Sequence, residues 1–200
     1  MNVFNATKKY VLENDTVRLT PLAEHDYPYL LPFALNEPEL WKYSLFSGAG
    51  SDGLTKYIEK AIAAKALGIE YPFIVFDKRT NEYAGSTRFY DIQPANKVVQ
   101  IGYTWYGKKF QGTGLNKNCK LLLLSFAFEE LGMERVEFRA DNRNEKSIAA
   151  MKSIGCVAEG ILRSHAVTPV GERRDSIVLS ILKNEWYGGV KDNLTKRTAT

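Results

Sequence analysis

The order of apolar and polar positions along the chain predicts a series of strands. Runs rich in β-branched and aromatic residues, bounded by Gly, Pro, Asn and Asp, are typical of strands. The predicted strands cover residues 17–22, 71–77, 82–92, 97–106, 134–140, 157–167 and 173–182. Because only a few residues join the second strand to the third and the third to the fourth, these three are expected to form an antiparallel meander.

Apolar residues at helical spacing predict four helices. They cover residues 24–36, 51–68, 114–131 and 144–154. Pro28 and Pro32 interrupt the first helix, whereas Ser51 and Gly68 suit the N-cap and C-cap of the second. The second half of the chain alternates strand, helix and strand, which leaves room for a parallel crossover. We therefore predict an α/β fold in which helices flank a mixed, mostly antiparallel twisted sheet of about seven strands.

The chain has 200 residues, a length nearer to one domain than to two. Its 44% hydrophobic and 12% aromatic residues exclude disordered, collagen-like and coiled-coil proteins. Residues 1–16 are expected to form an N-terminal extension and residues 17–186 a single domain. Gly188, Gly189 and the polar run after them predict a flexible tail over residues 187–200.

Charge and cysteine content narrow the class of protein further. Cys119 and Cys156 do not have the spacing of a metal site or a disulfide framework, so we expect no metal and a reducing compartment. No apolar run approaches the roughly 18 residues of a membrane span, and we expect a soluble, cytoplasmic protein without a membrane partner. The net charge of +4 does not indicate a nucleic-acid partner, but it suits a small anionic ligand.

The segment from Tyr103 to Asn116 contains the most informative pattern, a strand that leads through a glycine-containing turn into a helix. Gly112 and Gly114 leave room for backbone amides to face an anion, and the helix N-terminus adds unpaired N–H groups. Neighbouring lysines add positive charge: Lys108, Lys109, Lys117 and Lys120. The alternative interpretation is a tight loop without a ligand.

The two common nucleotide motifs do not fit this segment. The P-loop requires a Gly-Lys pair followed by Ser or Thr, which is absent here. The dinucleotide fingerprint requires a third glycine where Lys117 stands. A nicotinamide-dependent oxidoreductase therefore rests on the glycine turn alone.

The six residues from Gln111 to Asn116 resemble the pyrophosphate loop of the Gcn5-related N-acetyltransferases (GNAT), whose pattern is Gln or Arg, any two residues, Gly, any residue, then Gly or Ala. Asn116 departs from the last position. The segments Asn144–Ser147, Glu159–Arg163 and Arg174–Ser176 are similar to the RimJ/RimL branch of this superfamily. The resemblance covers residues 17–186.

This resemblance implies that acetyl-CoA is the cosubstrate. The loop after the fourth strand would bind the pyrophosphate, and the strand backbone would bind the pantetheine arm. The residues expected to contact the cosubstrate are Tyr103, Thr104, Trp105, Gln111, Gly112, Thr113, Gly114, Leu115, Asn116 and Asn144. Asn144 also suits a plain helix N-cap.

The catalytic residues are harder to assign. By resemblance, Ser147 would protonate the departing thiolate, although serine is also ordinary in a first helical turn. Many relatives have Glu where this chain has Gln100, which cannot accept a proton. We consider Glu70 the first candidate for the base, with a solvated turn residue as the alternative interpretation, and His165 the second.

The expected activity is transfer of an acetyl group from acetyl-CoA to a primary amine, preferably the α-amine of a protein or peptide. The alternatives are a small-molecule acceptor such as a polyamine, amino sugar or antibiotic, and a CoA-binding module without turnover. The identity of the acceptor, the acyl chain and the choice between monomer and homodimer are left open by the sequence.

Overall fold

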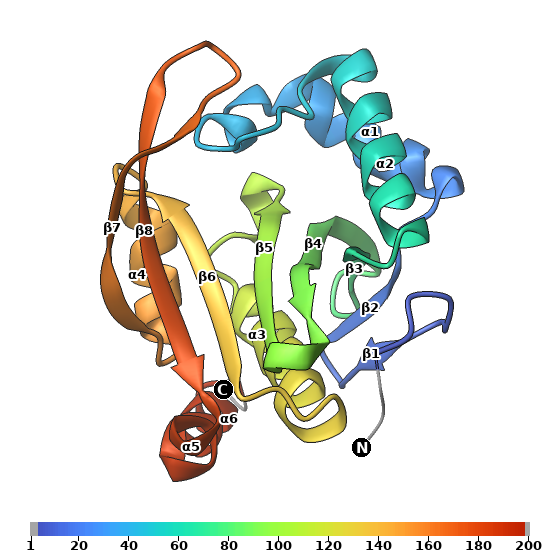
Figure 1. Ribbon diagram of the computed structural model, residues 1–200. Helices are drawn as coiled ribbons and strands as arrows, with labels where there is room; N and C mark the ends of the chain where they lie inside the picture. The colour runs from blue at the N-terminus through green and yellow to red at the C-terminus, as the bar shows by residue number, and fades with distance from the viewer. Residues whose placement is uncertain (1–3, 199–200) are drawn as a thin grey trace.

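A computed structural model of the protein describes residues 4–198 and contains one eight-stranded sheet (Figure 1). The strands are β1 Leu12–Glu13, β2 Val17–Pro21, β3 Glu70–Asp77, β4 Glu82–Gln93, β5 Val98–Tyr106, β6 Arg135–Asp141, β7 Val157–Val167 and β8 Arg173–Leu182. Their order in the sheet is β1-β2-β3-β4-β5-β6-β8-β7, and among these neighbours only β5 and β6 are parallel. The predicted mixed, mostly antiparallel sheet is confirmed, and the short strand β1 adds to the seven strands expected.

The helices pack on both faces of this sheet. They are α1 Tyr27–Asn36, α2 Gly50–Ala66, α3 Leu115–Ser125, α4 Glu145–Ser153, α5 Lys183–Glu185 and α6 Lys191–Lys196. Consecutive residues of β5 identify the faces, because neighbouring side chains of a strand point in opposite directions. Trp105 packs against Phe33 of α1 and Tyr57 of α2, whereas Thr104 bonds to Lys120 of α3. Helices α1 and α2 therefore cover one face and α3 the other.

The sheet opens between its two parallel strands. Residues 98–100 of β5 pair with residues 135–137 of β6, and beyond this point the two strands have no further pairing. Beyond Gln100, β5 still pairs with β4 but no longer with β6. A bulge lies in this part of β5, where Tyr103 and Thr104 together face Thr87 of β4. Tyr103 has a φ of 48° there, an uncommon value for a non-glycine residue. The carboxyl-terminal half of β5 thus presents a free backbone edge to the gap.

The structure differs from the expected flexible tail over residues 187–198. Trp186 is fully buried, its Nε1 donates to Glu129 at 2.9 Å, and its ring stacks on Phe128. Leu194 of α6 is also buried. Gly189 has a φ of 134° and forms a non-helical kink between these two buried residues. The glycines therefore bend the segment, which still packs on the core on both sides of the kink, and residues 199–200 lie outside the described residues.

Part of the predicted N-terminal extension belongs to the sheet. Leu12 and Glu13 pair with β2, and the backbone N–H of Tyr10 donates to the hydroxyl of Tyr71 on β3 at 3.0 Å. Residues 1–3 of the extension lie outside the described residues. Between residues 4 and 198, no helix has both the length and the apolar character needed to cross a membrane.

Candidate active site

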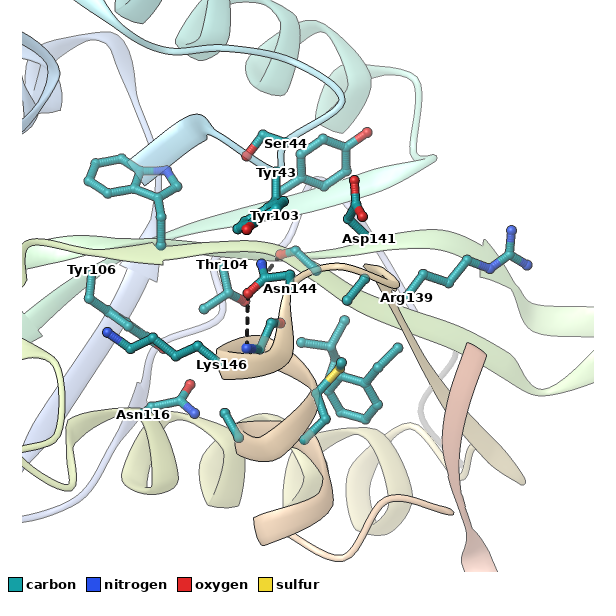
Figure 2. Close-up of a pocket in the computed structure, with 18 of the residues that line it drawn as sticks. Tyr43, Ser44, Tyr103, Thr104, Tyr106, Asn116, Arg139, Asp141, Asn144 and Lys146 are labelled. Atoms are coloured by element: carbon teal, nitrogen blue, oxygen red, sulfur yellow. Dashed lines mark hydrogen bonds between the residues drawn. The ribbon is translucent and has the colours of Figure 1, made fainter. Parts of the chain in front are cut away.

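A cavity of about 920 Å³ occupies the gap between β5 and β6. It is lined by the two strands, the start of α3, helix α4 and residues of β7 and β8, and the segment between α1 and α2 closes it on the other face of the sheet. Figure 2 shows this division, with Tyr43 and Ser44 on one side of the strands and Asn116, Asn144 and Lys146 on the other. Residues from both faces of the sheet therefore line the cavity.

One end of the cavity forms a cradle for an anion. Gly112 and Gly114 have φ values of 79° and 83°, and a Cβ built on either would meet nothing within 4 Å. Gly114 is the N-cap of α3, whose first N–H groups have no helical partner and carry partial positive charge. Lys117 and Lys146 also line this end. The loop can thus approach a polyanion through its backbone.

Neighbouring contacts fix the shape of this loop. Gln111 donates through Nε2 to the Tyr106 carbonyl at 2.8 Å, and its Oε1 contacts Lys146 Nζ. Thr113 directs its hydroxyl back to the Phe110 carbonyl at 2.7 Å. Leu115 is fully buried in the core. Of the expected cosubstrate contacts, only Thr113 and Leu115 are absent from the cavity lining, and they shape the loop instead.

The β5 edge supplies the middle of the cavity. The carbonyl of Tyr103 accepts a hydrogen bond from the Tyr57 hydroxyl at 3.3 Å, and the Tyr103 ring lies 4.1 Å from the Arg88 guanidinium carbon. Burial raises the pKa of Tyr103 above its ordinary value, so its hydroxyl stays protonated at neutral pH. The residue is held by three neighbouring side chains, since Tyr90 also packs edge-on against its ring.

Ser147 and Asn144 lie together at the start of α4 and both line the cavity. The side chain of Asn144 accepts a hydrogen bond from the Ser147 backbone N–H at 3.1 Å, which is the N-cap geometry considered from the sequence. The Ser147 hydroxyl has no hydrogen-bond partner among residues 4–198. It is therefore available to a ligand.

The structure does not bring Glu70 into the cavity lining. Its Oε2 lies 2.6 Å from Arg88 Nη1, and the Arg88 side chain is only 2% exposed. Arg88 also stacks on the rings of Tyr57 and Tyr103. Glu70 thus neutralises a buried guanidinium and does not face the cavity.

The carboxylates that do line the cavity already have partners. Gln100 donates through Nε2 to Asp91 at 2.6 Å. Asp141 accepts from Arg143 at 2.8 and 3.0 Å, and these hydrogen bonds hold its pKa below the ordinary value. Glu39 forms an ion pair with Lys108. Within the described part of the chain, each carboxylate of the cavity lining thus has a hydrogen-bond or ion-pair partner, and the partners of Asp91 are amides, not cations.

Lys120 of α3 lies below β5 and is 4% exposed. Its Nζ donates to Thr104 at 2.8 Å and contacts Thr87 at 3.4 Å. Burial lowers its pKa to about 8. From the sequence we expected only a flanking surface charge here. The signal that could have placed this position inside is the apolar pattern of the surrounding helix, with Cys119, Leu123 and Leu124, all of which are buried.

The segment between Trp41 and Phe46 also lines the cavity and was not assigned from the sequence. Its signal is a run rich in aromatic residues between Pro38 and Gly48. Such a run without helical or strand periodicity is typical of a binding loop. Arg139 was not singled out either, because a charged residue in a strand ordinarily faces solvent.

Comparisons with known proteins agree with this geometry. The family model "Acetyltransferase (GNAT) domain" matches residues 16–157. "Putative ribosomal N-acetyltransferase YdaF" of Bacillus subtilis is 36% identical over 104 residues, which are 52% of this chain and 56% of YdaF. The three curated relatives are matched over 56–64% of their own length.

Solved structures cover the chain more completely. A crystal structure of a "putative acetyltransferase" from T. thermophilus has a TM-score of 0.86 and 33% identity, covering 98% of this chain and 99% of its own. Mycobacterium smegmatis RimJ in complex with CoA-disulfide shares the fold, with a TM-score of 0.77 and 19% identity over 94% of this chain and 93% of its own. The family match over residues 16–157 and the near-complete structural match show that the chain belongs to the GNAT acetyltransferase family.

Proposed function

We propose that the protein transfers the acetyl group of acetyl-CoA to the α-amine of a peptide or protein. The open edge of β5 beside an anion cradle supports the cosubstrate, and this is the observation that carries the proposal. The ribosomal N-acetyltransferase name of YdaF supports a protein acceptor.

The residues present fit coenzyme A. A side chain at Gly112 or Gly114 would fill the space that a phosphate needs, and the chain leaves that space open. The amides after Gly114 would hold the pyrophosphate, with Lys117 and Lys146 beside them. The unpaired half of β5 would bind the amide groups of the pantetheine arm as an added strand would.

Acetyl-CoA supplies an activated thioester. The neutral amine attacks the thioester carbon, the carbon–sulfur bond breaks, and the surplus proton of the amine passes to water. The protein then needs to hold the amine in line, stabilise the charge that develops on the thioester oxygen and protonate the leaving thiolate. A backbone N–H at the Tyr103 bulge would serve the second purpose, and the Ser147 hydroxyl the third. A thiolate with a pKa of about 8.5 leaves readily, so the contribution of Ser147 is expected to be modest.

The α-amine is favoured because each carboxylate of the cavity lining within the described residues already accepts hydrogen bonds or forms an ion pair. An α-amine has a pKa of about 7.7–8.0, so much of it is neutral at a pH of about 7.5, whereas a lysine side chain near 10.4 is almost fully protonated. Glu70 is bound to Arg88, and His165 accepts a hydrogen bond from Arg139. Neither is free to remove a proton from a lysine ammonium.

The small-molecule acceptors fit less well. Lys120, Arg139 and Arg174 all line the cavity, and their charges repel a polyamine or an aminoglycoside.

We further propose that the protein acts in the cytoplasm, where the free thiols of Cys119 and Cys156 stay reduced.

One peptide that carries both an α-amine and an internal lysine tests the proposal. After incubation with acetyl-CoA, mass spectrometry should locate the acetyl group on the α-amine. Ser147→Ala should lower kcat by less than the roughly hundredfold or more that general acid catalysis typically contributes, while the Kd of acetyl-CoA stays unchanged. Ser51→Ala, an exposed change on α2, is the matched control. Acetylation of the lysine alone would contradict the α-amine acceptor, and binding without turnover would identify a CoA-binding module.

A further inference from the structure

Four side chains form a hydrogen-bonded row at the end of the cavity opposite the α3 loop, which is the glycine-containing loop of residues 111–114 before α3. We call it the arginine row, and it consists of Arg139 of β6, His165 of β7, and Ser176 and Arg174 of β8. Arg139 Nη1 lies 3.3 Å from His165 Nε2, and His165 Nδ1 lies 3.1 Å from Ser176 Oγ. Arg174 Nε donates to the same Ser176 Oγ at 3.1 Å. All four residues line the cavity.

The hydrogen-bond donors of the row determine which ring nitrogen of His165 carries the proton. A guanidinium only donates, so His165 Nε2 must accept from Arg139, and the proton of a neutral imidazole must lie on Nδ1. Burial and the charges of Arg139, Arg174 and Arg173 lower the pKa of His165 in agreement with this. The row therefore carries its positive charge at its two ends, on Arg139 and Arg174.

Arg174 is a buried charge that the described chain does not neutralise directly. It is 6% exposed, and its Nη1 donates to the Tyr43 carbonyl at 3.1 Å. Among residues 4–198, no carboxylate oxygen lies within 4.0 Å of its nitrogens, and its Nη2 has no hydrogen-bond partner. The charge of Asp141 attracts Arg174 from beyond contact distance, but both Asp141 oxygens are bound to Arg143.

The other buried arginine of the sheet shows what a purely structural guanidinium requires. Arg88 is 2% exposed, about as buried as Arg174, and Glu70 lies 2.6 Å from it. Burying a charge without a counter-charge in direct contact is costly. The two residues differ in their surroundings, because Arg174 lines the cavity and Arg88 does not. A ligand in the cavity can therefore supply the carboxylate that Glu70 supplies to Arg88.

We infer that Arg174, together with Arg139, binds a carboxylate carried by the acceptor close to the amine that is acetylated. Arg139 already bonds to Glu137 at 2.7 Å, so Arg174 contributes most of the attraction. A guanidinium recognises a carboxylate through paired N–H donors. This inference rests on the proposed function, and it names acceptors with an acidic side chain near the α-amine as the preferred class.

A carboxylate next to an amine has two sources, an acidic peptide and a free amino acid. The test uses three peptides with one Asp at position one, two or three, three partners with Asn instead, and free aspartate and asparagine. For the wild-type protein, at least one Asp peptide should exceed its Asn partner in kcat/KM by roughly ten- to hundredfold, the range of a charge-assisted hydrogen bond.

Variants separate recognition of charge from support of the fold. Arg174→Gln should abolish the preference for Asp, raising KM for the Asp peptide more than it lowers kcat, while Arg174→Lys should restore part of it. Arg173→Gln is the matched control, because Arg173 lies on the same strand, binds Ser164 and does not line the cavity. A wild-type protein that treats Asp and Asn acceptors alike, or an Asp preference that survives Arg174→Gln, would overturn the inference.

The same experiment distinguishes failure of the proposed function. If free aspartate is acetylated in an Arg174-dependent way and no peptide is, the carboxylate site stands and the peptide acceptor is wrong. If peptides are acetylated without regard to Asp, the peptide acceptor stands and the carboxylate site is wrong. If neither kind of acceptor reacts, both proposals fall.

Discussion

The buried lysine of α3 allows a quantitative test of the electrostatics of the cavity. Lys120 has a pKa of about 8 instead of the ordinary 10.5, which corresponds to about 3 kcal/mol of lost stability when the amine is protonated. Replacing Lys120 by methionine keeps most of the side-chain volume and removes the charge. The two hydroxyls that Lys120 leaves behind, those of Thr87 and Thr104, lie 2.8 Å apart and can bond to each other.

The sign of the pH dependence follows from the direction of the shift. The unfolded chain binds the proton more tightly, so the destabilisation is complete below about pH 8 and disappears as the pH rises from about 8 to 10.5. Lys120→Met should therefore raise the free energy of unfolding by about 3 kcal/mol at pH 7, and by progressively less at pH 9 and pH 10.

Urea unfolding of the wild type and the variant between pH 7 and pH 10 measures this difference. Lys117→Met serves as the control, since Lys117 is a more exposed lysine of the same helix. Both variants contain the same other titratable groups, so the pH dependence that those groups cause is the same in each and drops out of the comparison. A Lys120→Met difference that is constant from pH 7 to pH 10, or a variant less stable than the wild type at pH 7, would refute the reasoning.

Three further predictions concern the loop, the C-terminal helices and acid stability. Gly114→Ala should weaken acetyl-CoA binding at least tenfold by calorimetry. Gly171→Ala is the matched control and should leave binding unchanged, because both glycines have a φ near +84° and an open Cβ position. Equal Kd values for the two variants would remove the α3 loop from the binding site. Trp186→Ala should lower the free energy of unfolding in urea by about 3–5 kcal/mol, and a loss below about 1 kcal/mol would show that the C-terminal helices do not contribute to the core. Arg135 holds the pKa of Glu159 at about 2, so the stability that Glu159→Gln removes should be largest above about pH 4.5 and shrink as the pH falls toward 2; an unchanged difference at pH 3 would contradict the ion pair.

The sequence predicted the elements that repeat a simple period and missed those that depend on tertiary contacts. Strands such as β3 and β4 were placed within about two residues, because their apolar residues lie between clear turn signals. The α3 loop was found because glycine at positive φ before a helix is a local property. The C-terminal helices were missed because Gly188 and Gly189 suggested a tail, although Trp186 and Leu194 are buried in the core.

The functions of individual charged residues were harder to predict, because they depend on which partner each one meets. Glu70 faces Tyr90 across β3 and β4, and only this register brings Arg88 within reach of it. Lys120 is separated from Thr104 by 16 positions and a change of element. Periodicity tells which residues are inside, but it does not tell which buried charges have counter-ions.

Lys120 and Arg174 share a property that links the two substrates of the proposed reaction. Both are buried, both line the cavity, and neither has a carboxylate within 4.0 Å among the described residues. Such charges lower the stability of the folded chain by themselves, but they attract anions and repel cations in a site from which water is partly excluded. A protonated lysine or polyamine acceptor enters this field unfavourably, whereas a largely neutral α-amine next to a carboxylate enters it favourably. The same charges that destabilise the folded chain therefore favour the acceptor class inferred from the arginine row.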